Sequence, residues 1–163
     1  MIRLPLILLL PLIIGCATVP AKMNATFNES DFIPYAQSGT ANITGSVFLK
    51  TIGGDVKLGA GNEVMLSPIT PYVRERLERV TIRREKLEEP DQRWFQKYVR
   101  RTLADATGNF EFKNLPAGEY VIYCDIFWSY GAGTSMQTTG DTAFATVTVK
   151  SGETSKVVVT RNF

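Results

Sequence analysis

The sequence contains no histidine, and only two of its 163 residues are cysteine. Without histidine the chain cannot form a Ser-His-Asp or Cys-His catalytic arrangement, and it lacks the commonest side-chain ligand of metal ions. Two cysteines are too few for a disulfide framework. Neither a phosphate-binding Walker loop nor a dinucleotide-binding glycine fingerprint is present. We therefore expect a protein that is not an enzyme and that holds no metal and no cofactor.

An excess of charge of one sign is also absent. The chain has 18 Lys and Arg residues against 16 Asp and Glu residues, which gives a net charge of +2. Such a balance provides no long-range attraction to nucleic acid, which is therefore not an expected partner. A long hydrophobic run is missing as well. The apolar stretch at residues 4–14 is shorter than the ~20 residues of a membrane-spanning helix, and two prolines interrupt it.

What the N-terminus does have is the pattern of a secretory signal. Arg3 supplies a positive charge, residues 4–14 are apolar, and Gly15 and Cys16 follow. The stretch Ile-Ile-Gly-Cys resembles the lipobox of bacterial lipoproteins, which implies cleavage before Cys16 and a diacylglycerol on its sulfur. An ordinary signal peptide cut near Ala17 is the alternative. Because Ala17 replaces the aspartate that retains lipoproteins in the inner membrane, the resemblance implies an outer-membrane anchor facing the periplasm or the cell surface.

The chain divides into a signal peptide at residues 1–15, a lipidated N-terminus and tether at 16–40, and one domain at 41–163. The tether has many small polar residues and few periodic apolar ones, and Phe27, Phe32 and Tyr35 are candidates to dock part of it on the domain. Anchoring through Cys16 makes a membrane the first expected partner. It also leaves Cys124 without an intramolecular partner, and we expect it to be a buried core residue.

From residue 41 the pattern is typical of β-structure. Short alternating runs are separated by turn residues, and Tyr120, Ile122, Cys124 and Ile126 are expected on one face of a long strand. Residues 51–62 are rich in glycine and predict a turn, and residues 129–140 (Gly, Ser and Thr) predict a loop. This succession of short strands predicts an all-β sandwich.

A more specific pattern lies at residues 102–123, TLADATGNFEFKNLPAGEYVIY. It contains a D-x-x-G turn, then F-x-F, then L-P-x-G-x-Y, and it resembles the signature of carboxypeptidase regulatory-like domains. The resemblance implies a seven-stranded transthyretin-like (prealbumin-like) sandwich of Greek-key, Ig-like type. The matching positions serve turns and core: Asp105, Gly108, Phe110, Phe112, Leu115, Pro116, Gly118 and Tyr120. The resemblance implies no particular function, because this scaffold carries many.

A charged segment at about 71–97 interrupts the pattern and predicts a short helical insert. Thr70 is a candidate N-cap, and Pro71 follows it at the first position of the helix (N1). Pro90 is expected to end the helix. Val73, Leu77, Val80 and Leu87 recur at helical spacing and form a stripe that can dock on the sandwich. The i,i+4 spacing predicts the ion pairs Glu75–Arg79 and Arg74–Glu78. We expect the insert to cover part of a sheet or an edge. It is either a solvated, salt-bridged face that protects an edge strand or a surface for a partner.

Two functions remain open on the sequence. The first is a non-catalytic, lipid-anchored envelope protein whose sandwich binds or scaffolds other envelope proteins through the insert. The alternative is a module that binds carbohydrate or peptidoglycan through exposed aromatic residues near the 129–140 loop. Trp128 can also have a purely structural role, in which it completes the core and contacts no ligand. The candidate surface residues are Arg83, Arg84, Trp94, Trp128 and Tyr130.

Overall fold

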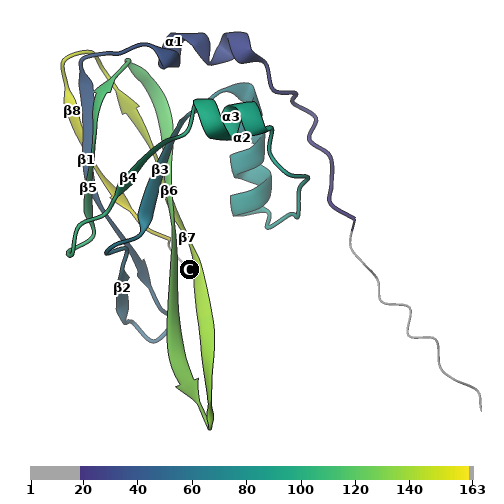
Figure 1. The fold of residues 1–163 in the computed structure, drawn as a ribbon, viewed down its shortest axis with the longest axis vertical. Helices are drawn as coiled ribbons and strands as arrows, with labels where there is room; N and C mark the ends of the chain where they lie inside the picture. Colours follow the sequence, from purple (N-terminus) through teal and green to yellow (C-terminus); the bar gives the residue numbers. More distant parts are fainter. Residues whose placement is uncertain (1–18, 162–163) are drawn as a thin grey trace, which may run out of the picture.

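The structure, a computed structural model, describes residues 19–161 (Figure 1). The predicted signal peptide and the predicted lipidation site, Cys16, lie outside the described residues. Within the described range, no helix combines the length and the apolar character needed to cross a membrane.

In the part of the chain that the structure describes, eight strands form two sheets. Their bounds are β1 (Ala41–Lys50), β2 (Val56–Leu58), β3 (Glu63–Pro68), β4 (Arg100–Leu103), β5 (Asn109–Leu115), β6 (Gly118–Ala132), β7 (Ser135–Val149) and β8 (Thr154–Val159). The first sheet has the order β2-β1-β5 with β8 paired parallel to β1, and the second has the antiparallel order β4-β3-β6-β7. The predicted mostly-β sandwich is confirmed at this level, with eight strands in place of seven.

The added strand, β2, lies inside the glycine-rich segment that was predicted as a turn. Its three residues pair with the end of β1 from Phe48↔Leu58 to Lys50↔Val56. Gly54 has a φ of +92° and closes the connection between the two strands. Val56 and Leu58 are exposed, so this strand shows no alternation of buried and exposed residues that the sequence could reveal.

The main core lies between the two sheets. Alternate residues of β1 are buried there, beginning with Ala41 and Ile43, and the inner face of β6 contributes Tyr120, Ile122, Cys124 and Ile126, as expected. Phe110, Phe112 and Leu115 of the sequence signature enter the same core. Each fully buried side chain of this kind stabilises the fold by roughly 1.5–3 kcal/mol.

The remaining signature residues build the turns around β5. Asp105 accepts hydrogen bonds from the backbone amides of Thr107 (2.8 Å) and Asn109 (2.9 Å). Gly108 has a φ of +81°, and a Cβ there would meet the Val47 carbonyl oxygen at 2.8 Å. Pro116 lies in the turn between β5 and β6, where its carbonyl accepts a hydrogen bond from the Tyr120 hydroxyl (2.9 Å).

The insert forms three short helical segments: α2 (Pro71–Arg76), the π-helix η2 (Leu77–Ile82) and α3 (Gln92–Lys97). The Thr70 side chain caps α2 as predicted, by accepting from the Val73 amide (3.4 Å). The predicted end at Pro90 is wrong, because the helix stops at Ile82. The β-branched run Val80-Thr81-Ile82 is a poor helix former, and Arg84 just beyond it has a φ of +58°.

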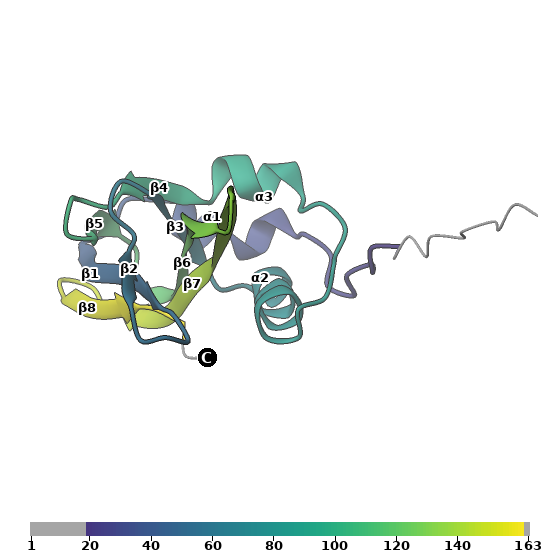
Figure 2. The ribbon, with the colours of Figure 1, turned by 90° about the horizontal axis from the view of Figure 1, so that it is seen from below.

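The insert makes a third layer on the outer face of the second sheet (Figure 2). A second apolar cluster fills the space between them, comprising Phe32, Ile69, Tyr72, Val73, Trp94, Tyr98, Val99 and Val121. The Trp94 indole N–H donates to the Ser67 hydroxyl on β3 (2.9 Å). The insert therefore covers a face of the sheet, which was one of the expected positions.

The predicted tether is docked for much of its length. It contains η1 (Glu29–Asp31) and α1 (Ile33–Ala36), and the buried Phe32 stacks on Phe27 and packs against Tyr98. Tyr35 meets the ring of Tyr120 edge-on, and Ala21 forms a parallel bridge with Leu87 of the insert.

The predicted loop at 129–140 is wrong. Strands β6 and β7 continue through it as a hairpin, paired without a break from Gly118↔Val149 to Ala132↔Ser135. Gly133, with a φ of +62°, supplies the turn at the tip. Neither face of this outer part of the β6–β7 hairpin is fully buried, so its sequence has the polar composition of a loop. Its structure is decided by the pairing of the two strands.

Candidate functional site

A cleft of about 300 Å³ lies between the insert and the outer face of β6 and β7. Its lining is mostly apolar with a few polar groups: Val73, Arg76, Leu77, Val80, Thr81, Pro90, Trp94, Phe95, Val121, Tyr123, Asp125 and Thr142. This composition is typical of sites for small molecules.

Strand β6 and the helical segments α2 and η2 direct most of these side chains into the cleft. Alternation along β6 directs Val121, Tyr123 and Asp125 outward, opposite to the inward set that fills the main core. On α2 and η2, the stripe that contains Val73, Leu77 and Val80 faces the sheet at helical spacing. The stripe predicted to dock the insert thus also forms one wall of the cleft.

Tyr123 is the most unusual residue of the cleft. Its hydroxyl oxygen is buried and has no hydrogen-bond partner among the described residues. Burial raises the pKa of Tyr123 to about 12, so the phenol stays neutral and can both donate and accept. A buried hydroxyl without a hydrogen-bond partner lowers the stability of the folded state by about 1–3 kcal/mol. A ligand that hydrogen-bonds to this hydroxyl would remove that penalty.

Arg76 and Asp125 bring one charge of each sign to the cleft, and neither belongs to an ion pair within the described part of the chain. The Arg76 guanidinium donates to the Glu88 carbonyl (3.1 Å) and lies 5.9 Å from the centroid of the Trp94 ring. Asp125 accepts a hydrogen bond from the Thr142 hydroxyl. The cleft thus offers separate groups for polar recognition.

An exposed aromatic ring extends this surface along the hairpin. Phe127 follows Asp125 on the same face of β6 and is 65% exposed. It is paired with Gly140, where a Cβ would lie 2.4 Å from the Phe127 Cδ1 atom. Only glycine therefore lets the ring lie against β7 at this place.

The predicted aromatic candidates do not gather at one site. Trp94 forms part of the cleft wall, and its indole N–H is already bound to Ser67. Trp128 and Tyr130 lie on the opposite face of the hairpin, where Trp128 packs against the main core. Tyr130 is 45% exposed and donates to the Gln137 side chain (3.0 Å). Trp128 and Tyr130 thus lie on the same hairpin as the cleft but on its other face.

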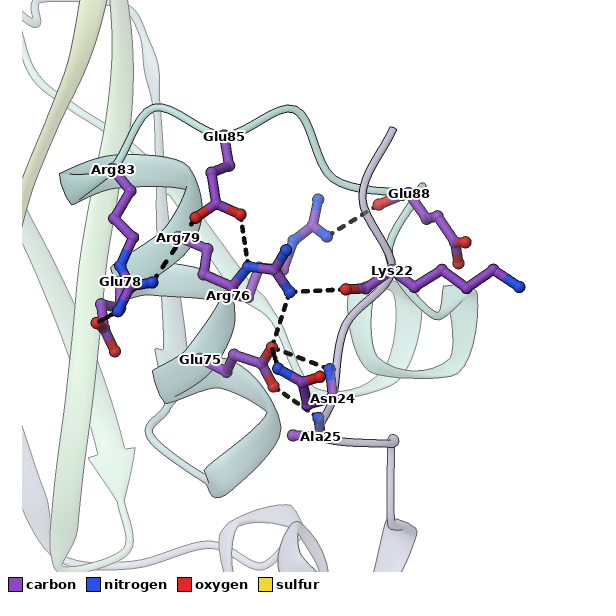
Figure 3. Close-up of polar contacts among 10 residues, drawn as sticks. All are labelled: Lys22, Asn24, Ala25, Glu75, Arg76, Glu78, Arg79, Arg83, Glu85 and Glu88. Atoms are coloured by element: carbon purple, nitrogen blue, oxygen red, sulfur yellow. Dashed lines mark hydrogen bonds and ion pairs between the residues drawn. The ribbon is translucent and has the colours of Figure 1, made fainter. Parts of the chain in front are cut away.

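The predicted arginine candidates are engaged within the chain. Arg83 pairs with Glu78 and Glu85, and Arg84 pairs with Asp141 on β7 at 3.4 Å (Figure 3 shows the Arg83 contacts). Neither of the two lines the cleft.

A charged network beside the cleft fixes the N-terminal segment to the insert (Figure 3). Glu75 accepts from the backbone amides of Asn24 (2.9 Å) and Ala25 (2.6 Å), which lowers the pKa of Glu75 to about 2. Arg79 binds Glu75 (2.9 Å), as predicted, and also the Lys22 carbonyl (2.7 Å). We call this network, formed by Lys22, Asn24, Ala25, Glu75 and Arg79, the N-terminal clamp.

The other predicted pair of the helix, Arg74–Glu78, does not form. Arg74 reaches Glu119 at the start of β6 (2.6 Å), and Glu78 binds Arg83. Each of these two ion pairs joins residues that are more than four positions apart in the sequence, so the i,i+4 rule cannot predict it.

The described residues contain no group of three His, Cys, Asp or Glu side chains placed to hold a metal ion. Cys124 is buried in the main core, where burial raises the pKa of its thiol to about 11 and keeps it protonated. The Asp105 carboxylate is used by the turn that follows it, and the backbone amide of Asn109 leads the contacts that lower its pKa to about 2.

The fold is similar to that of a protein of known structure. No family model and no curated protein matches the chain. A crystal structure from Pseudomonas aeruginosa, described as that of "a putative carbohydrate binding protein", is similar over 84% of this chain and 99% of its own, with a TM-score of 0.73 and 28% sequence identity. The chain is thus similar to that protein in architecture over almost the whole of the protein's length.

Proposed function

We propose that this protein binds carbohydrate, and that the cleft between the insert and β6–β7 is its binding site. The observation that carries the proposal is the buried Tyr123 hydroxyl, which has no hydrogen-bond partner within residues 19–161 and belongs to a cleft with aromatic walls. The description of the similar Pseudomonas aeruginosa structure supports the same class of ligand.

The chemistry of the cleft suits a sugar. A sugar ring has apolar C–H faces and a rim of hydroxyl groups, so it needs flat apolar surface and a few polar partners. Trp94, Phe95 and Phe127 supply the apolar surface, while Tyr123, Asp125 and Thr142 supply donors and acceptors. A volume of about 300 Å³ is at the lower end for ligand sites. We therefore expect it to take a short segment of a glycan, with Phe127 extending the contact outside.

This proposal favours the second of the two functions suggested by the sequence and moves its site. The scaffolding of envelope proteins finds no similar support, because Arg83 and Arg84 of the insert pair within the chain. The glycan site moves from the 129–140 segment with Trp128 and Tyr130 to the opposite face of the same hairpin.

We further propose the setting expected from the sequence. The protein is a secreted, non-catalytic lipoprotein, anchored by lipid on Cys16 to the outer membrane. Its sandwich is of the transthyretin-like, Greek-key kind found in carboxypeptidase regulatory-like domains. Labelling of the protein with a fatty acid analogue in cells, lost in Cys16→Ser, tests the anchor.

The test of the binding site compares the two faces of the hairpin. The purified protein, with Phe127→Ala and Tyr130→Ala variants, is titrated with glycans that bind it on an array and with isolated peptidoglycan. We expect Phe127→Ala to weaken binding about fivefold, the equivalent of about 1 kcal/mol of aromatic contact. Tyr130→Ala, a similarly exposed aromatic on the other face, should leave affinity unchanged.

Two outcomes would contradict the proposal. Absence of binding to every glycan and to peptidoglycan would remove the function. A loss of affinity in Tyr130→Ala with none in Phe127→Ala would keep the function and return the site to the opposite face.

A further inference from the structure

The arginines of the insert differ in one respect that bears on the ligand. Within residues 71–97, all but one of the arginines form ion pairs with a carboxylate: Arg74, Arg79, Arg83, Arg84 and Arg93. Arg76 forms none with the described residues, and it alone of these arginines lines the cleft. The cleft therefore contains a cation that pairs with no carboxylate of residues 19–161.

Arg76 is also held in a fixed position. It is partly buried, one guanidinium nitrogen donates to the Glu88 carbonyl (3.1 Å), and the guanidinium carbon lies 5.9 Å from the Trp94 ring centroid. A guanidinium carries five N–H donors, so most of them remain for another acceptor. A planar donor group fixed beside an apolar wall is suited to bidentate binding of a carboxylate.

Asp125 makes the two sides of the cleft opposite in charge. It lies on the β6 side with its carboxylate accepting from Thr142, whereas Arg76 lies on the insert side. An anionic group on a ligand is attracted toward Arg76 and repelled from Asp125, while hydroxyl groups can donate to the Asp125 carboxylate. The two charges together select one orientation of a ligand that has a carboxylate at one end and hydroxyls at the other.

Resting on the proposed function, we infer that the glycan is acidic, and that a carboxylate borne by the sugar pairs with Arg76 while ring hydroxyls contact Asp125 and Tyr123. Glycans that carry such a group include uronic acid polysaccharides and peptidoglycan strands freed of peptide, whose lactyl groups end in carboxylates. The chemistry at Arg76 is the same for both.

The experiment removes the carboxylate and the cation separately. The purified protein is titrated with oligogalacturonate, oligoglucuronate and peptide-free peptidoglycan strands, each beside its carboxyl-reduced, neutral counterpart. The variants are Arg76→Gln, Arg76→Lys and, as a matched control on the same helix, Arg74→Gln. Circular dichroism melts check that all of them fold.

We expect at least one acidic glycan to bind about ten- to a hundredfold more tightly than its reduced form, the range for a hydrogen-bonded charge pair. Arg76→Gln should abolish that difference without changing the affinity for the reduced form, and Arg76→Lys should retain part of it. Arg74→Gln should behave like the wild type. Added salt should weaken only the binding of acidic glycan. The acidic probe that binds identifies the source of the carboxylate.

The inference is overturned if acidic and reduced glycans bind equally, or if Arg76→Gln weakens both forms alike. In either case the glycan-binding function survives, because the neutral forms still bind. If neither acidic nor neutral glycan binds, the proposed function and the inference fail together.

Discussion

At the scale of single residues, two tyrosines of β6 form a natural comparison. Tyr120 and Tyr123 both have a pKa raised to about 12 by burial. The Tyr120 hydroxyl donates to the Pro116 carbonyl, whereas the Tyr123 hydroxyl has no partner in the described structure. Because one hydroxyl is hydrogen-bonded and the other is not, removing the two hydroxyls should have different consequences for stability.

We expect Tyr120→Phe to lower the free energy of unfolding by about 1 kcal/mol, the typical value of one hydrogen bond. Tyr123→Phe should leave it unchanged or raise it, since an unsatisfied group disappears, and should weaken glycan binding by about two- to tenfold. Urea denaturation and calorimetric titration measure the two effects. Equal destabilisation by both substitutions would mean that the Tyr123 hydroxyl is satisfied in the free protein.

Asp105 predicts a dependence of stability on pH. Its pKa is lowered to about 2 by the amide of Asn109 and further hydrogen bonds from Thr107 and Asn109, below the usual value of about 3.9. The native state therefore gains stability from this carboxylate at pH values above about 4, and loses it as the pH falls toward 2. Asp105→Asn should lower the melting temperature at pH 7 and flatten its decline between pH 4 and pH 2. Identical pH profiles in both proteins would contradict this role.

The sequence predicts such turn residues well and the cleft poorly, because the turn depends on local contacts and the cleft on contacts between distant segments. Asp105 and Gly108 satisfy local backbone requirements within five residues, and their chemistry is readable in any window of sequence. The role of Tyr123 arises from an insert that follows β3 and folds back over β6. No local pattern marks a hydroxyl that is left without a partner.

At the scale of elements, the insert is joined to the sandwich mainly through the second apolar cluster. Trp94 is 6% exposed in that cluster, packs edge-on against Tyr72 and donates to Ser67. The main core between the sheets is separate from it. The packing of one cluster should therefore be disrupted without unfolding the other.

We expect Trp94→Ala to weaken the packing of the insert by about 3–5 kcal/mol, the usual cost of emptying an aromatic site. Amide hydrogen exchange should accelerate in α2, η2 and α3 and stay slow in β1 and β5. Phe127→Ala, which removes an exposed ring, is the control and should change neither. Faster exchange throughout the sandwich in Trp94→Ala would show that the two clusters unfold as one unit.

Strands with one buried face were predictable, and elements without such a face were not. The alternation of β1 and of the inner half of β6 appears directly in the sequence because every second residue is buried. Strand β2 and the outer hairpin lack this contrast, so their glycines and threonines resembled a turn and a loop. The π-helical end of the insert was missed because its geometry depends on packing beyond the helix.

At the scale of the whole molecule, the N-terminal clamp changes how the domain is connected to an anchor. The expected tether at residues 16–40 is held on the domain from Ala21, where the Ala21 amide donates to the Lys86 carbonyl (2.9 Å). If Cys16 carries the proposed lipid, the chain between it and Ala21 can extend by at most about 17 Å. The domain would then be held close to the membrane, and the length of its tether would depend on whether the clamp is closed.

We expect the double substitution Glu75→Gln and Arg79→Gln to open the clamp, because it removes the acceptor charge for two backbone amides and the donor to the Lys22 carbonyl. Trypsin cleavage after Lys22 should then become faster at neutral pH, while the melting temperature of the sandwich changes little. Arg83→Gln is the matched control, since Arg83 lies in the same charged surface but does not contact residues 21–25 (Figure 3). Equal cleavage rates in all three proteins would mean that the backbone bridge at Ala21 and the packing of Phe27 and Phe32 hold the segment without the clamp, and these contacts would then set the distance between domain and anchor.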